Sequence, residues 1–273
     1  WIFDTTAFLH RALHVVYRDL VAEVPADHTQ FLKHASVMVS GLLDRLQVEN
    51  VVFALDSSVP SIRVKEWPAY KEGRKAYPPV LAAGAPKFYE GLRAAGFCVV
   101  GWDGYEADDV IATLVYAQGS SDHRPTMIVS SDKDLLQLVT PSGNVALYDP
   151  TKDRIMRSDE CVEKMGVEPR FVPDLIALTG DTSDNIPGVP SVGPKTALKL
   201  IEAWGTIEDI YRHETLFETV VSKRIAGLLR ENRERAFLSK SLALPRIFPD
   251  VTWQMFPCRS PGARSLRDIA SYW

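Results

Sequence analysis

The fold class is indicated by a short apolar run that ends in an acid, VVFALD at residues 51–56. An unbroken apolar run rich in β-branched residues is typical of a strand that is buried on both faces of a parallel sheet. The same pattern occurs in WIFD at residues 1–4 and in MIVSSD at residues 127–132, and GFCVV at residues 96–100 gives a further strand. Residues 31–46 carry apolar side chains at helical spacing. We therefore predict an α/β fold with a doubly wound, mainly parallel sheet.

Three of the predicted strands lead into Asp4, Asp56 and Asp132. Because the carboxyl ends of parallel strands lie at one edge of the sheet, we expect these side chains to meet there. Further acids occur in GYEADD, SDKD and GDTSD, and the complete set is Asp4, Asp56, Glu106, Asp108, Asp109, Asp132, Asp134, Asp181 and Asp184. Carboxylates that are packed together repel each other, so the pattern predicts a divalent metal site. For residues 104–109 taken alone, an ordinary acid-rich helix start is the alternative.

Residues 57–86 differ from their surroundings because prolines, basic residues and aromatic rings are mixed together. The rings are Trp67, Tyr70 and Tyr77, and the basic residues between them are Arg63, Lys65, Lys71, Arg74 and Lys75. Such a mixture suits a strand of nucleic acid, whose phosphates would lie on the cations and whose bases would lie on the rings. A solvated surface loop is the alternative.

From residue 171 the pattern becomes all-helical. The stretch IPGVPSVGPKTA at residues 186–197 reads as a glycine-bounded hairpin that opens a helix with a proline near its first position. Small residues allow close approach of a backbone, and the exposed N–H groups at a helix start favour phosphate. The hairpin is therefore a predicted phosphate site.

Composition limits the class of protein. The 273 residues, 46% of them hydrophobic, suit one large α/β domain or a domain with an appended module. No apolar stretch approaches the ~20 residues of a membrane span, and we expect a soluble cytoplasmic protein, associated with the nucleoid if bacterial. The net charge is −4, but without the nine acids 26 acidic residues remain against 31 Lys and Arg, which allows a nucleic-acid partner. Three widely spaced cysteines indicate reduced thiols, and the histidines form no metal motif.

Taken in order, these motifs resemble the 5′ nuclease family. The resemblance rests on Asp4 with Arg11, PSIR at residues 60–63, YKEGR at 70–74, GYEADD at 104–109, SDKDL at 131–135 and the stretch 178–195. The family includes the 5′-3′ exonuclease domain of bacterial DNA polymerase I, phage 5′ nucleases and flap endonucleases. It implies a PIN-like core at residues 1–170 with a helical arch at 57–86, a helix-hairpin-helix module of the helix-3-turn-helix type at 171–245, and a C-terminal extension at 246–273 packing back on the core. Whether the chain is a standalone nuclease or an excised domain stays open.

The resemblance also implies residue roles. Asp56, Glu106, Asp108 and Asp109 are similar to a first metal cluster, and Asp132, Asp134, Asp181 and Asp184 to a second, with Asp4 as a further ligand. Two Mg²⁺ ions are implied, with Mn²⁺ as a substitute, and a K⁺ ion at the hairpin. Tyr70 is implied to stack on a base, and Lys71 and Arg74 to contact the scissile phosphate. The implied DNA-binding residues are Arg11, Arg63, Gly188, Ser191, Gly193, Lys195, Thr196 and Lys199.

The expected function is hydrolysis of DNA phosphodiesters by two metal ions, leaving 5′-phosphate products, in replication and repair. The expected partner is duplex DNA with a free 5′ end, flap or junction, bound by a monomer; no replication partner is identified. A PIN-type ribonuclease and a non-catalytic DNA-structure binder are the alternatives. A haloacid-dehalogenase phosphatase is disfavoured because Thr6 stands where its second Asp is needed. Two residues depart from the family pattern: Thr5 and Ser191 each replace a usual glycine, and serine would be strained at Ser191 if that position needs positive φ.

Overall fold

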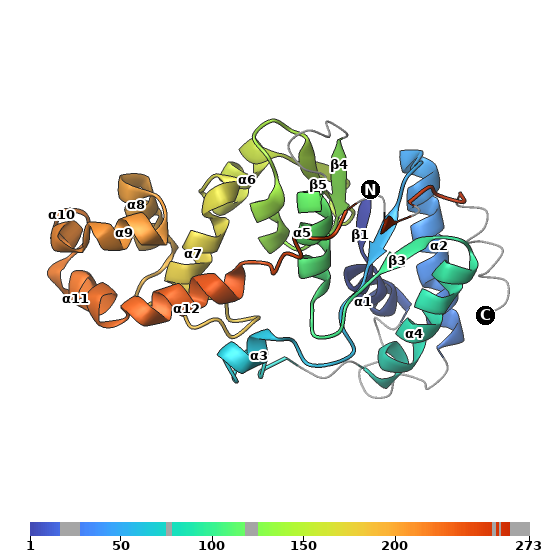
Figure 1. Cartoon of the computed structure of the whole chain (residues 1–273), viewed down its shortest axis with the longest axis horizontal. Coiled ribbons are helices and arrows are strands. Elements are labelled where there is room, and N and C mark those ends of the chain that lie inside the picture. The colour runs from blue at the N-terminus through green and yellow to red at the C-terminus, as the bar shows by residue number, and fades with distance from the viewer. Residues whose placement is uncertain (17–27, 75–77, 118–124, 253–254, 257, 263–273) are drawn as a thin grey trace.

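The computed structural model describes residues 1–16, 28–74, 78–117, 125–252, 255–256 and 258–262. These residues form a six-stranded sheet in the order β3-β2-β1-β4-β5-β6 (Figure 1). All neighbouring strands pair in parallel except β6, which runs antiparallel to β5. The strands are β1 (Ile2–Asp4), β2 (Val52–Ala54), β3 (Cys98–Val100), β4 (Thr126–Val129), β5 (Val145–Asp149) and β6 (Arg154–Met156). The predicted doubly wound, mainly parallel sheet is confirmed.

Helices cover both faces of the sheet. Because side chains alternate in direction along each strand, neighbouring strand residues pack into two different apolar cores. Phe3 and Phe53 belong to one apolar core, together with residues of α1, α2 and α4. Ile2 and Val52 belong to the other, together with residues of α5, α6 and α7. These helices are α1 (Thr5–Val16), α2 (Thr29–Leu46), α4 (Pro79–Ala94), α5 (Ala107–Ala117), α6 (Ser158–Met165) and α7 (Val172–Thr179). The unbroken apolar runs in the sequence follow from this double burial.

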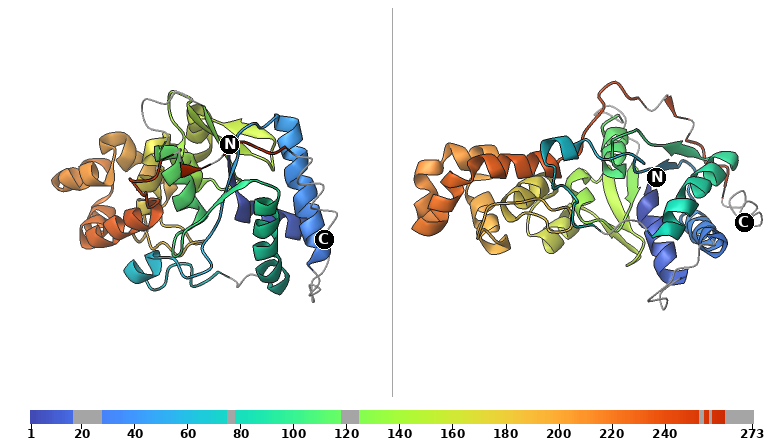
Figure 2. Two further views of the ribbon diagram at one scale, coloured as in Figure 1. Left: turned by 45° about the vertical axis from the view of Figure 1, so that its right-hand side comes forward. Right: turned by 90° about the horizontal axis from the view of Figure 1, so that it is seen from below.

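The last part of the chain is helical and extends from one side of the sheet (Figures 1 and 2). It comprises η2 (Pro169–Phe171), α7, α8 (Pro194–Trp204), α9 (Ile207–Arg212), η3 (Glu214–Leu216), α10 (Phe217–Val220), α11 (Lys223–Glu231) and α12 (Arg233–Ala243). α12 returns toward the sheet and packs along α7. The core that includes Ile2 and Val52 continues into this part through residues of α8, α9 and α11, so the helical part and one face of the sheet share a single apolar interior.

Residues 57–86, predicted as an arch, contain α3 (Arg63–Glu66), a series of turns and the beginning of α4. Lys75 and Tyr77 lie outside the described residues. Beyond α12 the chain crosses α5 and reaches the sheet, where Phe248 packs against Trp102 and Tyr105. Farther on, Asn50 and Arg259 form an antiparallel bridge.

Cys98, Cys161 and Cys258 are free thiols, as the sequence predicts. In the part of the chain that the structure describes, no helix has both the length and the apolar character needed to cross a bilayer.

Candidate active site

The ends of three adjacent strands bring the predicted aspartates together. Asp4 is the last residue of β1, Asp56 follows β2 by two residues, and Asp132 follows β4 by three. Because β1 lies between β2 and β4, these carboxylates project from neighbouring positions at one sheet edge. Glu106, which directly precedes α5, and Asp108, in the first turn of α5, line the same cleft.

Seven of the nine acids line one open cleft of about 250 Å³. They are Asp4, Asp56, Glu106, Asp108, Asp132, Asp134 and Asp184, and the cleft is also lined by His10, Lys71 and Arg74. The segments that supply them are 50 or more residues apart in several cases. The predicted convergence of distant acids is therefore observed for this part of the set.

Several of these acids lie close enough to repel one another. Burial, and then the charge of Asp56, raise the pKa of Asp4 to about 7. Burial, and then Asp132, raise the pKa of Asp134 to about 7 and hold the pKa of Asp108 well above its usual range. Each shift shows that negative charge is unfavourable here unless a positive group is added.

The oxygen-only donor set suits a hard divalent cation such as Mg²⁺ or Mn²⁺. One oxygen of Asp134, Oδ1, is buried and has no hydrogen-bond partner, which is the condition expected of a ligand awaiting an ion. As the side chains are placed, no three His, Cys, Asp or Glu groups among the described residues are close enough to hold an ion. The cleft thus provides oxygen donors of the right kind, although they are not gathered around one point.

Other acids are neutralised by basic residues of the 57–86 segment. Lys71 pairs with Glu106 and lies 3.6 Å from Asp184, which also pairs with Arg74. Although burial would raise it, the charges of Lys71 and then Arg63 lower the pKa of Glu106. Lys71 and Arg74 therefore stand at the edge of the cleft, as their predicted contact with a phosphate requires.

Two of the predicted site residues, Arg63 and Asp109, bind each other. Asp109 is fully buried, and its two oxygens accept from the Arg63 guanidinium at 2.7 and 2.9 Å. Arg63 is only 3% exposed, and Asp109 does not line the cleft, so their roles in DNA and metal binding stay predictions. Consecutive residues of a helix differ in direction by about 100°. Which of Asp108 and Asp109 enters the cleft therefore depends on the rotation of α5 about its axis, which the sequence does not fix.

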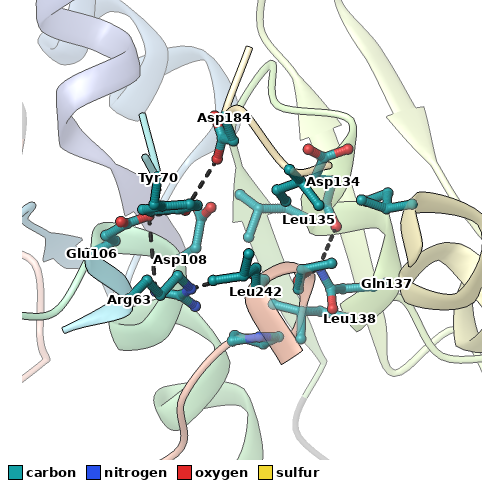
Figure 3. A pocket seen from close by; sticks show the side chains of 14 residues that line it. Arg63, Tyr70, Glu106, Asp108, Asp134, Leu135, Gln137, Leu138, Asp184 and Leu242 are labelled. Carbon is teal, nitrogen blue, oxygen red and sulfur yellow. Dashed lines mark hydrogen bonds and ion pairs between the residues drawn. The ribbon is translucent and has the colours of Figure 1, made fainter. Parts of the chain in front are cut away.

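Tyr70, which was predicted to stack on a base, is buried in the structure. Its ring is 5% exposed, with the cationic groups of Arg63 and Lys71 over it. Its hydroxyl oxygen lies 3.1 Å from a carboxylate oxygen of Glu106 and 3.1 Å from one of Asp184, so its single hydrogen can be donated to either acid. Figure 3 shows Tyr70 in this position, beside Arg63 and Asp108. Burial, and then Glu106, raise the pKa of Tyr70 far above its usual value. Tyr70 can therefore orient either acid, and its stacking on a base stays a prediction.

The loop that carries Asp181 and Asp184 is fixed by its own hydrogen bonds. Asp181 Oδ1 accepts from the Ser183 and Asp184 N–H groups, and Asp181 pairs with Ile186 through the main chain. Its other oxygen lies 3.4 Å from the Lys133 ammonium. Asp181 does not line the cleft, so its role as a ligand stays a prediction.

The predicted hairpin forms at residues 186–193 and leads into α8. Gly188 is buried against Gly180, where a side chain would meet the backbone at 2.3 Å, so packing requires a glycine here, and its contact with DNA stays a prediction. Ser191 has a φ of +63°, which bears out the strain expected for serine there. The remaining predicted binding residues are exposed or half-buried: Ser191, Gly193, Lys195, Thr196 and Lys199.

Arg11 is separate from both of these regions. It lines a recess of about 230 Å³ with Phe8, Met38 and Arg45, outside the acidic cleft. Its role in DNA binding stays a prediction.

Comparison with known proteins assigns the whole described architecture to one family. Residues 1–166 match the N-terminal resolvase-like domain of 5′-3′ exonucleases, and residues 167–256 match their C-terminal SAM-fold domain. The chain belongs to the 5′-3′ exonuclease family. The resemblance drawn from the sequence motifs is confirmed.

The 5′-3′ exonuclease relatives match over most of their length. The protein of Aquifex aeolicus is 36% identical over 223 residues, which are 80% of this chain and 74% of that protein. The protein of Buchnera aphidicola is 37% identical over 199 residues, 72% and 68% of the two chains. DNA polymerase I of Bacillus caldotenax is 35% identical over 80% of this chain, but the match spans only 25% of the polymerase.

Two solved structures share the fold of this exonuclease-family chain. T5 5′-exonuclease with divalent zinc ions bound superposes with a TM-score of 0.73 at 19% identity, covering 99% of this chain and 96% of that one. The catalytic core of Rad2 in complex with DNA substrate gives a TM-score of 0.60 at 15% identity, covering 99% and 85%. At these identities the likeness establishes the fold.

Sequence reasoning missed three residues that shape the site. Ser130 Oγ donates to Asp4 at 2.8 Å and accepts from the Asp132 N–H. Lys133 pairs with Asp181, and His10 lines the cleft. The position of Ser130 between a strand and Asp132 was the available signal, because a serine at a strand end can bond the next turn.

Proposed function

We propose that this exonuclease-family chain is a metal-dependent, structure-specific 5′ nuclease that hydrolyses DNA phosphodiesters and leaves 5′-phosphate ends. The observation that carries the proposal is the cleft in which seven acids from separate segments face Lys71 and Arg74. A nuclease needs this combination, since acids hold cations and basic side chains meet the phosphate. Replication and repair are the processes in which such ends are trimmed.

Asp4, Asp56, Asp108 and Asp132 would hold divalent ions, joined by Glu106, Asp134, Asp181 and Asp184 directly or through water. Two Mg²⁺ ions bound there would activate a water molecule and stabilise the departing oxygen, with Mn²⁺ as a substitute. Asp109 is left out of this set because Arg63 occupies it.

Lys71 and Arg74 would turn from Glu106 and Asp184 toward the phosphate. Both side chains are long and stand at the cleft edge, so rotation alone would bring them to a substrate. Their charges would offset the negative charge that grows on the phosphate in the transition state.

The helical part would bind the duplex without reading its sequence. Gly193 precedes α8, whose first-turn residues include the exposed Lys195, and a helix start with a nearby lysine favours phosphate. We also propose a K⁺ ion at this hairpin, at carbonyls other than those of Pro187 and Gly188, which already accept from Arg235. The implied division is a nuclease core at residues 1–170, a binding module at 171–245 and an extension at 246–273, acting as a monomer.

The test is product mapping on end-labelled flap, nicked and blunt duplexes, with Mg²⁺ and with EDTA. Mg²⁺-dependent products with 5′ phosphates, cut at the flap or from the free 5′ end, are expected, and D132N is the matched inactive control. Binding without products would instead favour a DNA-structure binder. Cleavage restricted to an RNA flap would favour a PIN-type ribonuclease.

A further inference from the structure

The buried pair of Arg63 and Asp109 is placed at a junction of three segments. Arg63 comes from α3, Asp109 comes from the first turn of α5, and the main chain after α12 closes the group. Figure 3 shows Arg63 with its guanidinium directed at Leu242, next to Asp108 and Tyr70. The side chains of Arg63 and Asp109 are 3% and 0% exposed.

Every polar atom of the pair is used inside the protein. Arg63 donates to Asp109 through both terminal nitrogens and to the carbonyl oxygens of Leu242 and Leu244 at 3.0 and 2.9 Å. Asp109 also accepts from the main-chain N–H groups of Glu106 at 2.9 Å and Arg246 at 2.7 Å. The Asp109 carboxylate thus accepts four hydrogen bonds, and four of the five N–H groups of Arg63 are used. The Arg63 Nη1 also lies 3.9 Å from the Glu106 carboxylate.

The bond from the Glu106 N–H fixes the first turn of α5, which carries Glu106 and Asp108 into the cleft. Asp109 caps that turn from within, as an N-terminal acid does. Arg63 then holds Asp109 in a single orientation through two parallel hydrogen bonds. The directions of two cleft acids therefore depend on a pair that does not itself enter the cleft.

The same pair is connected to the hairpin by contacts with α12. Leu242 and Leu244 lie at the end of α12, and earlier in that helix Ser239 accepts from the Gly188 N–H at 3.0 Å while Arg235 donates to the Gly188 carbonyl at 2.8 Å. One rigid helix thus links the hairpin with the first turn of α5.

We propose that Arg63 and Asp109 are positioning residues: together they align Glu106 and Asp108 for metal binding and set that alignment relative to the hairpin. The inference rests on the proposed nuclease function. A displacement of about 1 Å at a reacting centre lowers a rate on the order of 10²-fold, so loss of the pair is expected to reduce cleavage without removing a ligand.

The experiment uses the full chain and the variants D109N and R63Q, alone and combined. Three quantities are measured well below each melting temperature: the single-turnover rate on 5′-flap DNA in saturating Mg²⁺, the affinity for that DNA without Mg²⁺, and the number of Mn²⁺ ions bound. D109N should lower the rate on the order of 10²-fold while the DNA affinity and the Mn²⁺ number stay as in wild type. The double variant should be no slower than D109N, because both changes break the same contact.

A matched control is D149A. Asp149 is likewise buried and accepts from the Thr151 N–H at 2.9 Å, but it lies at the end of β5 and does not line the cleft. D149A should lose stability and keep the wild-type rate at saturating DNA. If D109N does not fold, R63K takes its place, because lysine keeps the buried charge and loses the two-pronged geometry.

Loss of one bound Mn²⁺ in D109N would overturn the inference and make Asp109 a ligand. A wild-type rate in D109N, or rate losses that multiply in the double variant, would overturn it as well. If the wild-type chain itself cleaves no DNA in Mg²⁺, the proposed function fails and the inference falls with it. Wild-type cleavage together with an unaffected D109N variant removes the inference alone.

Discussion

The main-chain N–H of Lys71 donates to the carbonyl oxygen of Asp184 at 2.9 Å, and the Lys71 ammonium lies 3.6 Å from the carboxylate of the same residue. Lys71 adopts a φ of +58° in this contact, a conformation that costs about 1 kcal/mol or more for a residue with a side chain. The strain is retained because the contact joins the 57–86 segment to the loop before the hairpin. The segment that carries Lys71 and Arg74 is thereby fixed to the loop that carries Asp184.

Replacement of Lys71 by methionine tests the role of its ammonium. K71M keeps the length of the side chain and removes the charge, so the single-turnover rate on 5′-flap DNA should fall on the order of 10²-fold. R74Q should have a similar effect. A rate within the error of wild type for both variants would show that the phosphate is stabilised elsewhere.

D132N tests the acidic cleft. Removal of a carboxylate at the sheet edge should lower cleavage in Mg²⁺ by at least about 10²-fold, because several kcal/mol of transition-state stabilisation come through the bound ions. Binding of the flap substrate should persist in gel-shift assays. E163Q, which breaks the exposed pair of Glu163 with Arg154, serves as a control with normal turnover.

Divalent ions should stabilise the folded chain. Mg²⁺ or Mn²⁺ at about 100 times its Kd adds about 2.7 kcal/mol, because the ion binds the gathered acids and not the unfolded chain. The measurement is the melting temperature with the ion and after EDTA. A melting curve that does not respond to either ion would speak against a site in the cleft.

D108N should raise the melting temperature of the metal-free protein while abolishing most cleavage. Asp108 is half-buried beside Asp132 and Asp4, so an uncharged amide relieves repulsion that a bound cation would offset in the wild type. Calorimetry without metal, compared with D103N at an exposed acid outside the cleft, provides the measurement. A lower melting temperature for D108N than for D103N would contradict the explanation.

S191G should stabilise the hairpin. Glycine accepts a φ of +63° without the cost of about 1 kcal/mol that serine incurs, and 1 kcal/mol corresponds to about 2–4 °C in a chain of this size. The weak contact of Ser191 with Arg224 at 3.4 Å offsets little of the gain. S222G, which removes the cap of α11, should change the melting temperature in the opposite direction.

K195M tests the duplex contact of the hairpin. If the Lys195 ammonium neutralises one phosphate, the slope of log affinity against log salt should become shallower by about 0.9. The rate at saturating DNA should stay unchanged. An unaltered salt slope would place the duplex on another surface.

The sequence by itself determined the sheet, the strand ends and the nature of the cleft. Strands buried on both faces must be apolar throughout, so the runs before Asp4, Asp56 and Asp132 identified them, and parallel strands bring their ends to one edge. Positive φ at Ser191 was only a condition at the level of the sequence, and the structure supplies it with a φ of +63°.

Only the tertiary structure decided the partners of the buried charges. Asp108 and Asp109 are identical in type and adjacent in sequence, yet Asp108 lines the cleft and Asp109 binds Arg63. The difference follows from the rotation of α5 and from the packing of α3 and of the chain after α12 against Asp109. Likewise, the sequence predicts an exposed ring at Tyr70, whereas in the structure its hydroxyl lies within hydrogen-bond distance of Glu106 and Asp184. A local sequence pattern indicates which side chains are buried. The partner of a buried charge, however, comes from segments that are distant in the chain.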